Sequence, residues 1–264
     1  VDLLEATRDA LLNSVQNNKG SGLEKALRVI ALNTREVGFR DLIAQLILDR
    51  TQLTRALTHG GLKGVASRVR ETFSLSETDT PKNVMTLACV DDSFDLRELH
   101  KAAEAMEVGK KTDAERAFRI KSWISNSPSH RATHFDEYCR AFLTTSDRPL
   151  SRLVTRSTRD EASHIAPTLK KEQNRIVKVR EKNNKAILAE CTISLLTVAA
   201  ALIRAYENEK TSNNLLDYDD LILKSKNLLH RPSVMSWVLY KLDGGIDHIL
   251  IDEAQDTNPD QWQV

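Results

Sequence analysis

The acidic run near the C-terminal end of the sequence holds the residues best suited to catalysis. Residues 252–256 read DEAQD and follow the short apolar run ILI at residues 249–251. A buried strand of this kind delivers the residues after it to the crevice where ligands bind in open α/β sheets. There, Asp252 would hold a Mg²⁺ ion that bridges nucleotide phosphates, because hard cations prefer oxygen ligands. Glu253 would orient the attacking water, and phosphoryl transfer needs little beyond such positioning and charge neutralisation.

The same two carboxylates have a purely structural alternative. Acidic residues are favourable at the start of a helix, so Asp252 and Glu253 could simply cap a helix that follows the apolar run. The spacing of the carboxylates alone does not separate the two interpretations.

A second candidate is a basic segment at residues 148–185, where 11 Lys and Arg face 4 Asp and Glu. Five of its cations step by four and three residues, and we call them the basic stripe: Lys171, Arg175, Lys178, Lys182 and Lys185. On a helix they fall within an arc of about 80° along about 21 Å. Leu169, Ile176 and Ile187 fall roughly opposite, so one face would be buried and the other would offer a positive ridge to DNA phosphates. A solvated charged face is the alternative, and the scarcity of aromatic neighbours favours backbone contact over base recognition.

Composition limits the class of protein to which these residues belong. The 264 residues are 41% hydrophobic and 28% charged, as in an ordinary soluble globular protein, and 9 Gly, 6 Pro and 5% aromatics favour helices. The net charge of +1 means that any affinity for nucleic acid must come from local charge. Three cysteines without a CxxC pair argue against a zinc site and fit a reducing cytoplasm. We expect no membrane span, because the richest apolar stretch, residues 193–203, is short and bounded by charges.

The elements that would position the candidate residues are mainly helices. Apolar residues recur with helical spacing through the N-terminal half, and Gly20 and Gly60 mark breaks between the segments. After Pro167 no Gly or Pro occurs before residue 230, which predicts long helices. Residues 249–251 predict a single strand, whose sheet neighbours must lie outside this sequence. The chain, which begins with Val, is therefore expected to be an internal piece of a longer protein.

The longer patterns resemble a known family. DEAQDTNPDQ at residues 252–261 closely resembles motif II of superfamily 1 DNA helicases of the UvrD and Rep type. LDYDDL at residues 216–221 resembles the DFDDL segment of the same family. WVLYKLDGGIDH at residues 237–248 looks closer still to AddA, the helicase-nuclease subunit of bacterial double-strand-break repair, and NTREVGF at residues 33–39 has a similar look. The clear matches cover residues 201–264.

This resemblance implies a mainly α fold class with two parts. Residues 1–208 would be a helical 1B-like subdomain inserted into the first RecA-like domain. Residues 209–264 would be a partial RecA-like (1A) segment that carries motif II. By the same resemblance, Asp252 would hold Mg²⁺ through ATP, Glu253 would be catalytic, and Gln255 would sense the γ-phosphate and couple it to DNA contacts. DNA would be the substrate of the whole protein, and an AddB-like subunit its partner.

One family feature is missing from this sequence. No GxxxxGK[ST] loop occurs to cradle phosphates. The nearest stretch, GKKT at residues 109–112, has Glu104 where the first Gly should stand and lies within helical sequence. We therefore expect Mg²⁺ and ATP to act in the full-length protein, and this piece alone to bind neither and to be inactive. Two other hypotheses stay open: a UvrD-type helicase without a nuclease, and a non-catalytic helical scaffold that docks a partner subunit.

Overall fold

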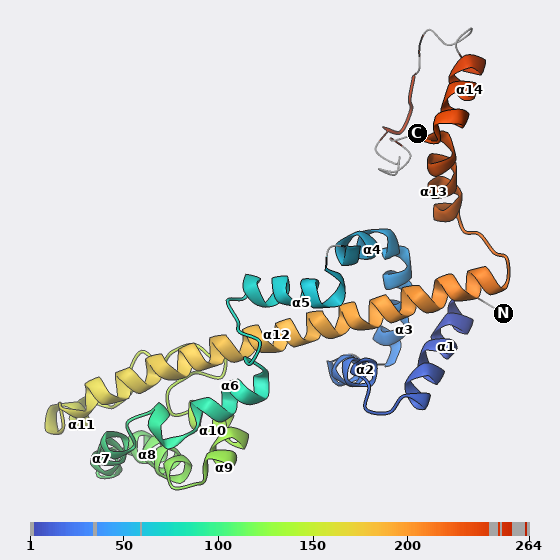
Figure 1. The fold of residues 1–264 in the computed structure, drawn as a ribbon. Coiled ribbons are helices and arrows are strands. Elements are labelled where there is room, and N and C mark those ends of the chain that lie inside the picture. Colours follow the sequence, from blue (N-terminus) through green and yellow to red (C-terminus); the bar gives the residue numbers. More distant parts are fainter. Residues whose placement is uncertain are drawn as a thin grey trace. The chain divides into compact units, whose positions relative to one another are not determined.

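The computed structural model describes residues 3–33, 36–58, 60–242, 248, 250–254 and 262. Within them the regular elements are all helical (Figure 1). In chain order they are α1 (Leu3–Asn17), α2 (Gly22–Asn33), α3 (Glu36–Leu48), α4 (Arg50–Thr58), α5 (Gly61–Thr72), α6 (Pro81–Ala88), the 3₁₀ turn η1 (Asp91–Ser93), α7 (Leu96–Glu107), α8 (Lys111–Ile124), α9 (Pro128–Thr133), α10 (Phe135–Cys139), α11 (Arg156–Glu161), α12 (Ile165–Ser212), α13 (Tyr218–Leu229) and α14 (Pro232–Leu242). The β-pairing in the described part of the chain is one isolated antiparallel bridge between Leu143 and Pro149.

The chain divides into two compact units. The larger comprises Ser14–Ala201, and the smaller comprises Val1–Asn13 together with Leu202–Val264. The predicted boundary at residue 208 lies inside α12, which runs without interruption because no Gly or Pro follows Pro167 until residue 232. The assignment of a 1B-like and a RecA-like part stays a prediction.

Local sequence signals explain where several helices begin. Gly60 has φ 83°, a left-handed conformation that favours glycine, and α5 starts directly after it. The Thr80 hydroxyl accepts a hydrogen bond from the backbone of Asn83 at the start of α6, and Asp95 caps α7 in the same way. Each such cap stabilises its helix by about 1 kcal/mol. The breaks predicted at Gly20 and Gly60 are therefore confirmed.

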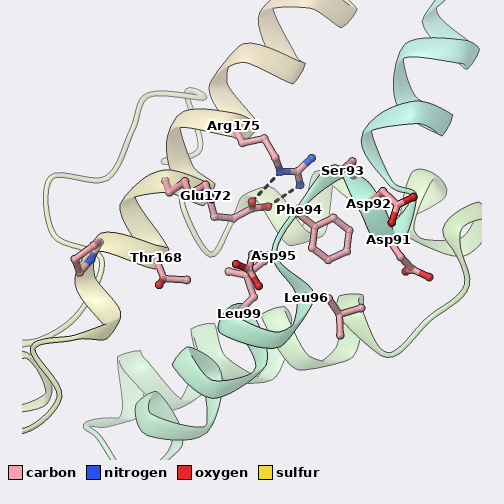
Figure 2. Close-up of a pocket in the computed structure, with 12 residues that line it drawn as sticks. Asp91, Asp92, Ser93, Phe94, Asp95, Leu96, Leu99, Thr168, Glu172 and Arg175 are labelled. Carbon is pink, nitrogen blue, oxygen red and sulfur yellow. Dashed lines mark hydrogen bonds and ion pairs between the residues drawn. The ribbon is translucent and has the colours of Figure 1, made fainter.

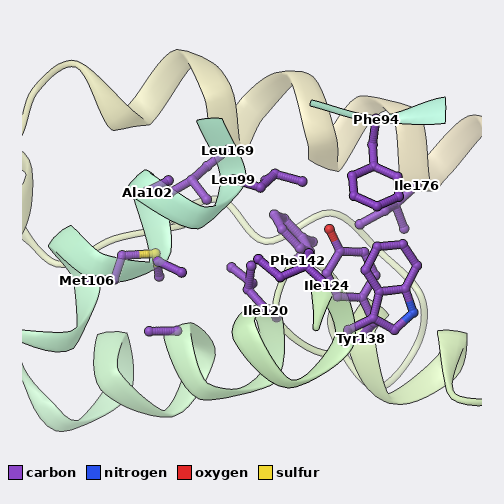
Figure 3. Packing of buried hydrophobic residues seen from close by; sticks show 14 of the residues in the cluster. Phe94, Leu99, Ala102, Met106, Ile120, Ile124, Tyr138, Phe142, Leu169 and Ile176 are labelled. Carbon is purple, nitrogen blue, oxygen red and sulfur yellow. The ribbon is translucent and has the colours of Figure 1, made fainter. Parts of the chain in front are cut away.

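The core of the larger unit is built around a group of aromatic rings (Figure 3). Trp123 of α8 stacks on Tyr138 of α10, with ring centroids 3.9 Å apart and planes 10° apart. The Phe94 ring lies 5.0 Å from Trp123. Leu169 and Ile176 of α12 are buried in the same cluster, as their helical spacing predicted. This packing fixes the first part of α12 against α7, α8 and α10.

The stretch GKKT comprises the end of the turn between α7 and α8 and the first two residues of α8. A Cβ atom at Gly109 would lie only 2.5 Å from the Thr158 hydroxyl oxygen, so glycine is required for close packing there. The buried Asp113 carboxylate, one turn into α8, accepts hydrogen bonds from the hydroxyls of Thr155 and Thr158. The turn is thus a packed structural junction, as its position within helical sequence indicated.

Helix α12 corrects one expectation about hydropathy. An 18-residue window of this helix reaches a mean hydropathy of 2.2, and by length and composition alone it could cross a membrane. The length of the apolar stretch was underestimated, because apolar residues continue on the N-terminal side of isolated polar residues such as Glu190. A third of the window, 33%, is buried inside the protein. One such helix is weak evidence for a membrane span, because the core helix of a soluble protein passes the same test of length and composition.

The strand predicted at residues 249–251 is not observed where the structure describes it. Leu250 and Ile251 have no regular secondary structure, and their exposed fractions are 99% and 50%. Ile249 lies outside the described residues. The physical reason is that a strand needs neighbouring strands for its backbone hydrogen bonds, and none is present among the described residues.

Candidate functional site

The described residues of the acidic motif, 252–254, lie at the surface. Asp252 and Glu253 are exposed, and Glu253 has φ 48° while its backbone N–H donates to Asp252 Oδ1 at 2.9 Å. Gln255 lies outside the described residues. The oxygen donors fit Mg²⁺, which takes one or two carboxylates and completes its shell with water and phosphate oxygens. Across the described residues, no group of three or more His, Cys, Asp and Glu could hold a metal by itself.

The second family-like segment, residues 216–221, forms an ion-pair network around Lys210. The Lys210 ammonium, 3% exposed, lies 2.7 Å from an Asp220 oxygen, 3.2 Å from Asp217 and 2.9 Å from Glu207. Burial by itself lowers the pKa of Lys210, but the three carboxylates raise it above its ordinary value. Asp217 and Asp220 also exchange hydrogen bonds as a capping box at the start of α13. The segment therefore anchors α13 to the end of α12.

Arg175, a member of the predicted basic stripe, points into a buried ion pair. Its guanidinium donates to both Glu172 oxygens, at 2.7 Å and 2.6 Å, and to the Ala88 carbonyl at 2.8 Å. The Tyr138 hydroxyl donates to the same carboxylate at 2.7 Å. Burial disfavours the charged form of Arg175, but Glu172 raises the pKa of the guanidinium overall. The side chain is therefore committed to this network, and its guanidinium carbon lies 5.2 Å from the centroid of the Phe94 ring.

The other four members of the stripe differ in their surroundings. Lys182 pairs with Asp79 at 2.6 Å, and Lys185 pairs with Glu181 at 2.7 Å. Lys171 and Lys178 are exposed and form no ion pair within the described part of the chain. The stripe therefore presents two uncompensated cations rather than five.

The start of the stripe borders a hollow of about 680 Å³, drawn in Figure 2. Its lining contains four carboxylates and two cations, a difference of −2: Asp91, Asp92, Asp95 and Glu172 against Lys171 and Arg175. The Arg175 guanidinium lies across the Glu172 carboxylate in this view. A phosphate in this hollow would meet more negative than positive charge, so the hollow does not suit an anion.

Comparison with known proteins decides the family. A protein-family profile described as the UvrD/REP helicase N-terminal domain matches residues 33–264, which is most of the chain. The chain belongs to the UvrD/Rep helicase family. The resemblance to UvrD-type and Rep-type helicases is thereby confirmed, whereas a specific closeness to AddA stays a prediction.

Curated relatives agree with membership of the UvrD/Rep helicase family. The chain is 39% identical over 66 residues to a probable DNA helicase of Mycoplasma pneumoniae, an alignment that covers 25% of this chain and 12% of the relative. It is 35% identical over 91 residues to a probable DNA helicase II homolog of Mycoplasma genitalium, covering 31% and 12%. The chain thus spans about an eighth of the length of these relatives. No solved structure gives a significant match.

Sequence reasoning missed the buried partners of Arg175 in this UvrD/Rep-family chain. Glu172 was counted only as one acid in a basic segment, and Tyr138 was not singled out. The available signal was the spacing of Glu172 and Arg175, because residues three apart on a helix are neighbours. The contact with the Ala88 carbonyl, 87 residues away in sequence, left no such signal.

Proposed function

We propose that this chain is part of an ATP-dependent DNA helicase. The observation that carries the proposal is the family match over residues 33–264, which includes the acidic motif at residues 252–256. The helicase names of the two Mycoplasma relatives support it. A cytoplasmic location belongs to the same proposal, and the free thiols of Cys89, Cys139 and Cys191 are compatible with a reducing compartment.

Within that function, each residue of the acidic motif has a distinct role. Asp252 supplies an oxygen ligand for Mg²⁺ held with ATP, and bound Mg-ATP supplies the phosphoryl group that is transferred. Glu253 accepts a proton from the attacking water or orients it. Gln255 would contact the γ-phosphate of bound ATP and couple it to DNA contacts. The loop that holds the phosphates belongs to a part of the whole protein outside this sequence.

Glu253→Gln in the full-length protein tests this assignment. Glutamine has nearly the same shape as glutamate but cannot act as a base. The turnover number for ATP should therefore fall by about 10² or more, with nucleotide binding retained. Turnover is measured by phosphate release, and binding by displacement of a fluorescent nucleotide. Glu77→Gln, an exposed acid in a loop of the larger unit, is the matched control and should change neither. Normal turnover in Glu253→Gln would remove Glu253 from its role.

More specifically, we propose that the whole protein acts in double-strand-break repair. This proposal rests on the AddA-like run at residues 237–248, whose aromatic residues Trp237 and Tyr240 are 61% and 79% exposed on α14. Such a role includes an AddB-like subunit as partner. The full-length protein with that subunit should degrade linear duplex DNA as well as unwind it. Unwinding without degradation would instead favour a UvrD-type helicase that lacks a nuclease.

The basic stripe remains our proposed DNA contact, reduced to its uncompensated members. Lys171 and Lys178 are exposed on the same face of α12 and would meet backbone phosphates. Replacing both with Gln should weaken binding of a short labelled duplex and make it less dependent on salt. Lys182 and Lys185 would contribute less, because each already faces a carboxylate.

A further inference from the structure

A second hollow of the larger unit has the opposite charge balance to that of Figure 2. It measures about 460 Å³, within the usual size range of ligand sites, and it lies between residues 150–154, α11 and the start of α12. Its lining contains three cationic side chains, Arg152, Arg159 and Lys170, and no carboxylate. No aromatic ring is among its lining residues either.

Among the described residues, no carboxylate forms an ion pair with these three cations. Arg152 and Arg159 are exposed and form no ion pair within the part of the chain that the structure describes. The Lys170 ammonium donates to the neutral side-chain oxygen of Gln173 at 2.7 Å. Asp160, next to Arg159 in sequence, pairs instead with Arg156 at 3.9 Å. An anion that enters the hollow therefore meets three charges without displacing an existing salt bridge.

The walls of the hollow are held in place by hydrogen bonds from Gln173 and Arg116. The amide of Gln173, 0% exposed, donates to the carbonyls of Phe142 and Leu150 at 2.9 Å and 3.0 Å. From α8, Arg116 donates to the carbonyls of Arg152 and Leu153 at 3.2 Å and 2.8 Å, so a fourth cation contacts the loop. Because the backbone is already ordered, a ligand would not bear the entropy of folding this loop.

The start of α12 borders the hollow. Ala166, in the first turn, lines the hollow, and that first turn contains no acidic residue. The helix start offers few backbone N–H groups, because the Ile165 N–H donates to the Ala162 carbonyl and Pro167 has none. An anion in the hollow would therefore be held by the three side-chain charges, and no acid of the first turn would oppose them.

We propose that this hollow, formed by Arg152, Arg159 and Lys170, binds backbone phosphates of DNA as a contact separate from the basic stripe. The inference rests on the proposed helicase function, which supplies DNA as the ligand. Without an aromatic ring to stack bases, or a carboxylate to accept from them, the contact is independent of sequence.

The test compares the present chain with two double variants of equal charge. Arg152→Gln with Arg159→Gln removes two cations of the hollow, whereas Lys82→Gln with Arg97→Gln removes two exposed cations of the same unit that line neither hollow. Binding of a short fluorescein-labelled duplex is measured by anisotropy at about 50 and about 200 mM salt. Loss of two phosphate contacts lowers the slope of log affinity against log salt concentration by about 1.8. Between the two salt concentrations, the affinity of the hollow variant should therefore fall by a factor about 12-fold smaller than the fall for the unmodified chain.

The outcomes separate this inference from the function on which it rests. A lower salt slope in the hollow variant, and an unchanged slope in the control, would support the proposal. If the chain binds DNA and both variants keep its slope, the hollow is not a DNA contact, whereas helicase function stands. If both variants lose slope equally, the contact is diffuse and the proposal is wrong. Stronger displacement of DNA by inorganic phosphate than by chloride at equal ionic strength would mark a free-phosphate site and would also overturn it. Failure of the Glu253→Gln test in the full-length protein would instead count against the helicase function.

Discussion

Replacing Arg175 with Met should destabilise the protein far more than it affects DNA binding. The substitution removes both charge-assisted hydrogen bonds to Glu172, whose side chain is 5% exposed, and leaves a buried carboxylate with only the Tyr138 hydroxyl as partner. Breaking a buried pair by removing one member costs about 3–5 kcal/mol. The Ala88 carbonyl keeps another donor, the Ser93 hydroxyl at 2.7 Å, so little is added there. We expect a loss of about 3 kcal/mol, with the retained Tyr138 hydrogen bond limiting the penalty.

The assay is urea unfolding followed by circular dichroism at neutral pH, with the melting temperature as a second measure. For a chain of this size about 3 kcal/mol corresponds to a fall of about 6–12 °C in melting temperature. Lys178→Met, one turn further along the same stripe, is the matched control and should change stability by less than about 0.5 kcal/mol. Adding Glu172→Gln to Arg175→Met should restore part of the loss, because the buried charge is then gone.

If Arg175→Met and Lys178→Met had the same stability and weakened DNA binding equally, Arg175 would belong to an exposed ridge. Failure of Glu172→Gln to restore any stability would show that lost packing of the arginine stem, and not an unpaired carboxylate, dominates.

The remaining predictions concern acid stability and thiol reactivity. Hydrogen bonds from the Lys182 ammonium and the Ser76 backbone lower the pKa of Asp79 from 3.8 to about 2. The Asp79–Lys182 pair therefore stabilises the fold above a pH of about 4, and this stabilisation is lost as the pH falls towards 2. Asp79→Asn should lower the free energy of unfolding by about 1 kcal/mol at neutral pH, because Lys182 is half exposed and its charge is screened. In equilibrium unfolding, the stabilities of the variant and the unmodified protein should converge near pH 2. A constant difference in stability down to that pH would contradict the assignment. Burial raises the pKa of the Cys89 thiol to about 11 and that of Cys139 to about 12, so iodoacetamide should modify Cys191 first in the native protein, as peptide mass spectrometry would show. Early modification of Cys139 would mean that α10 opens locally.

Local features of the fold were accessible from the sequence because their causes are local. Thr80 and Asp95 lie where caps are needed, Gly60 adopts the left-handed conformation that ends one helix and begins another, and the absence of breakers after Pro167 produces α12. The family resemblance could likewise be recognised from the sequence, because it depends on short patterns such as residues 216–221 and 252–256. The burial of Leu169 and Ile176 followed from helical spacing alone.

The limits of that spacing are visible on the same helix. Ile187 was expected on the buried face, yet it is 39% exposed, while its neighbours Ala186 and Ala189 are buried in a small cluster with Leu75 and Val84. Periodicity identifies residues that share a face, but it does not say which neighbouring element covers that face. The strand predicted at residues 249–251 shows the same limit, because an apolar run forms a strand only where neighbouring strands pair with it, and the described residues supply none.

The helical spacing of the charges and the membership of a helicase family can be read from the sequence alone. Which cations are left without an ion-pair partner among the described residues depends on the tertiary structure. Arg175 is neutralised by a carboxylate one turn away and held by a carbonyl 87 residues away, and Lys182 is paired with the distant Asp79. Arg152 and Arg159, which follow no helical repeat with the stripe, keep their charge uncompensated. Charge compensation acts over a few ångströms in space, and residues that are close in space need not be close in sequence.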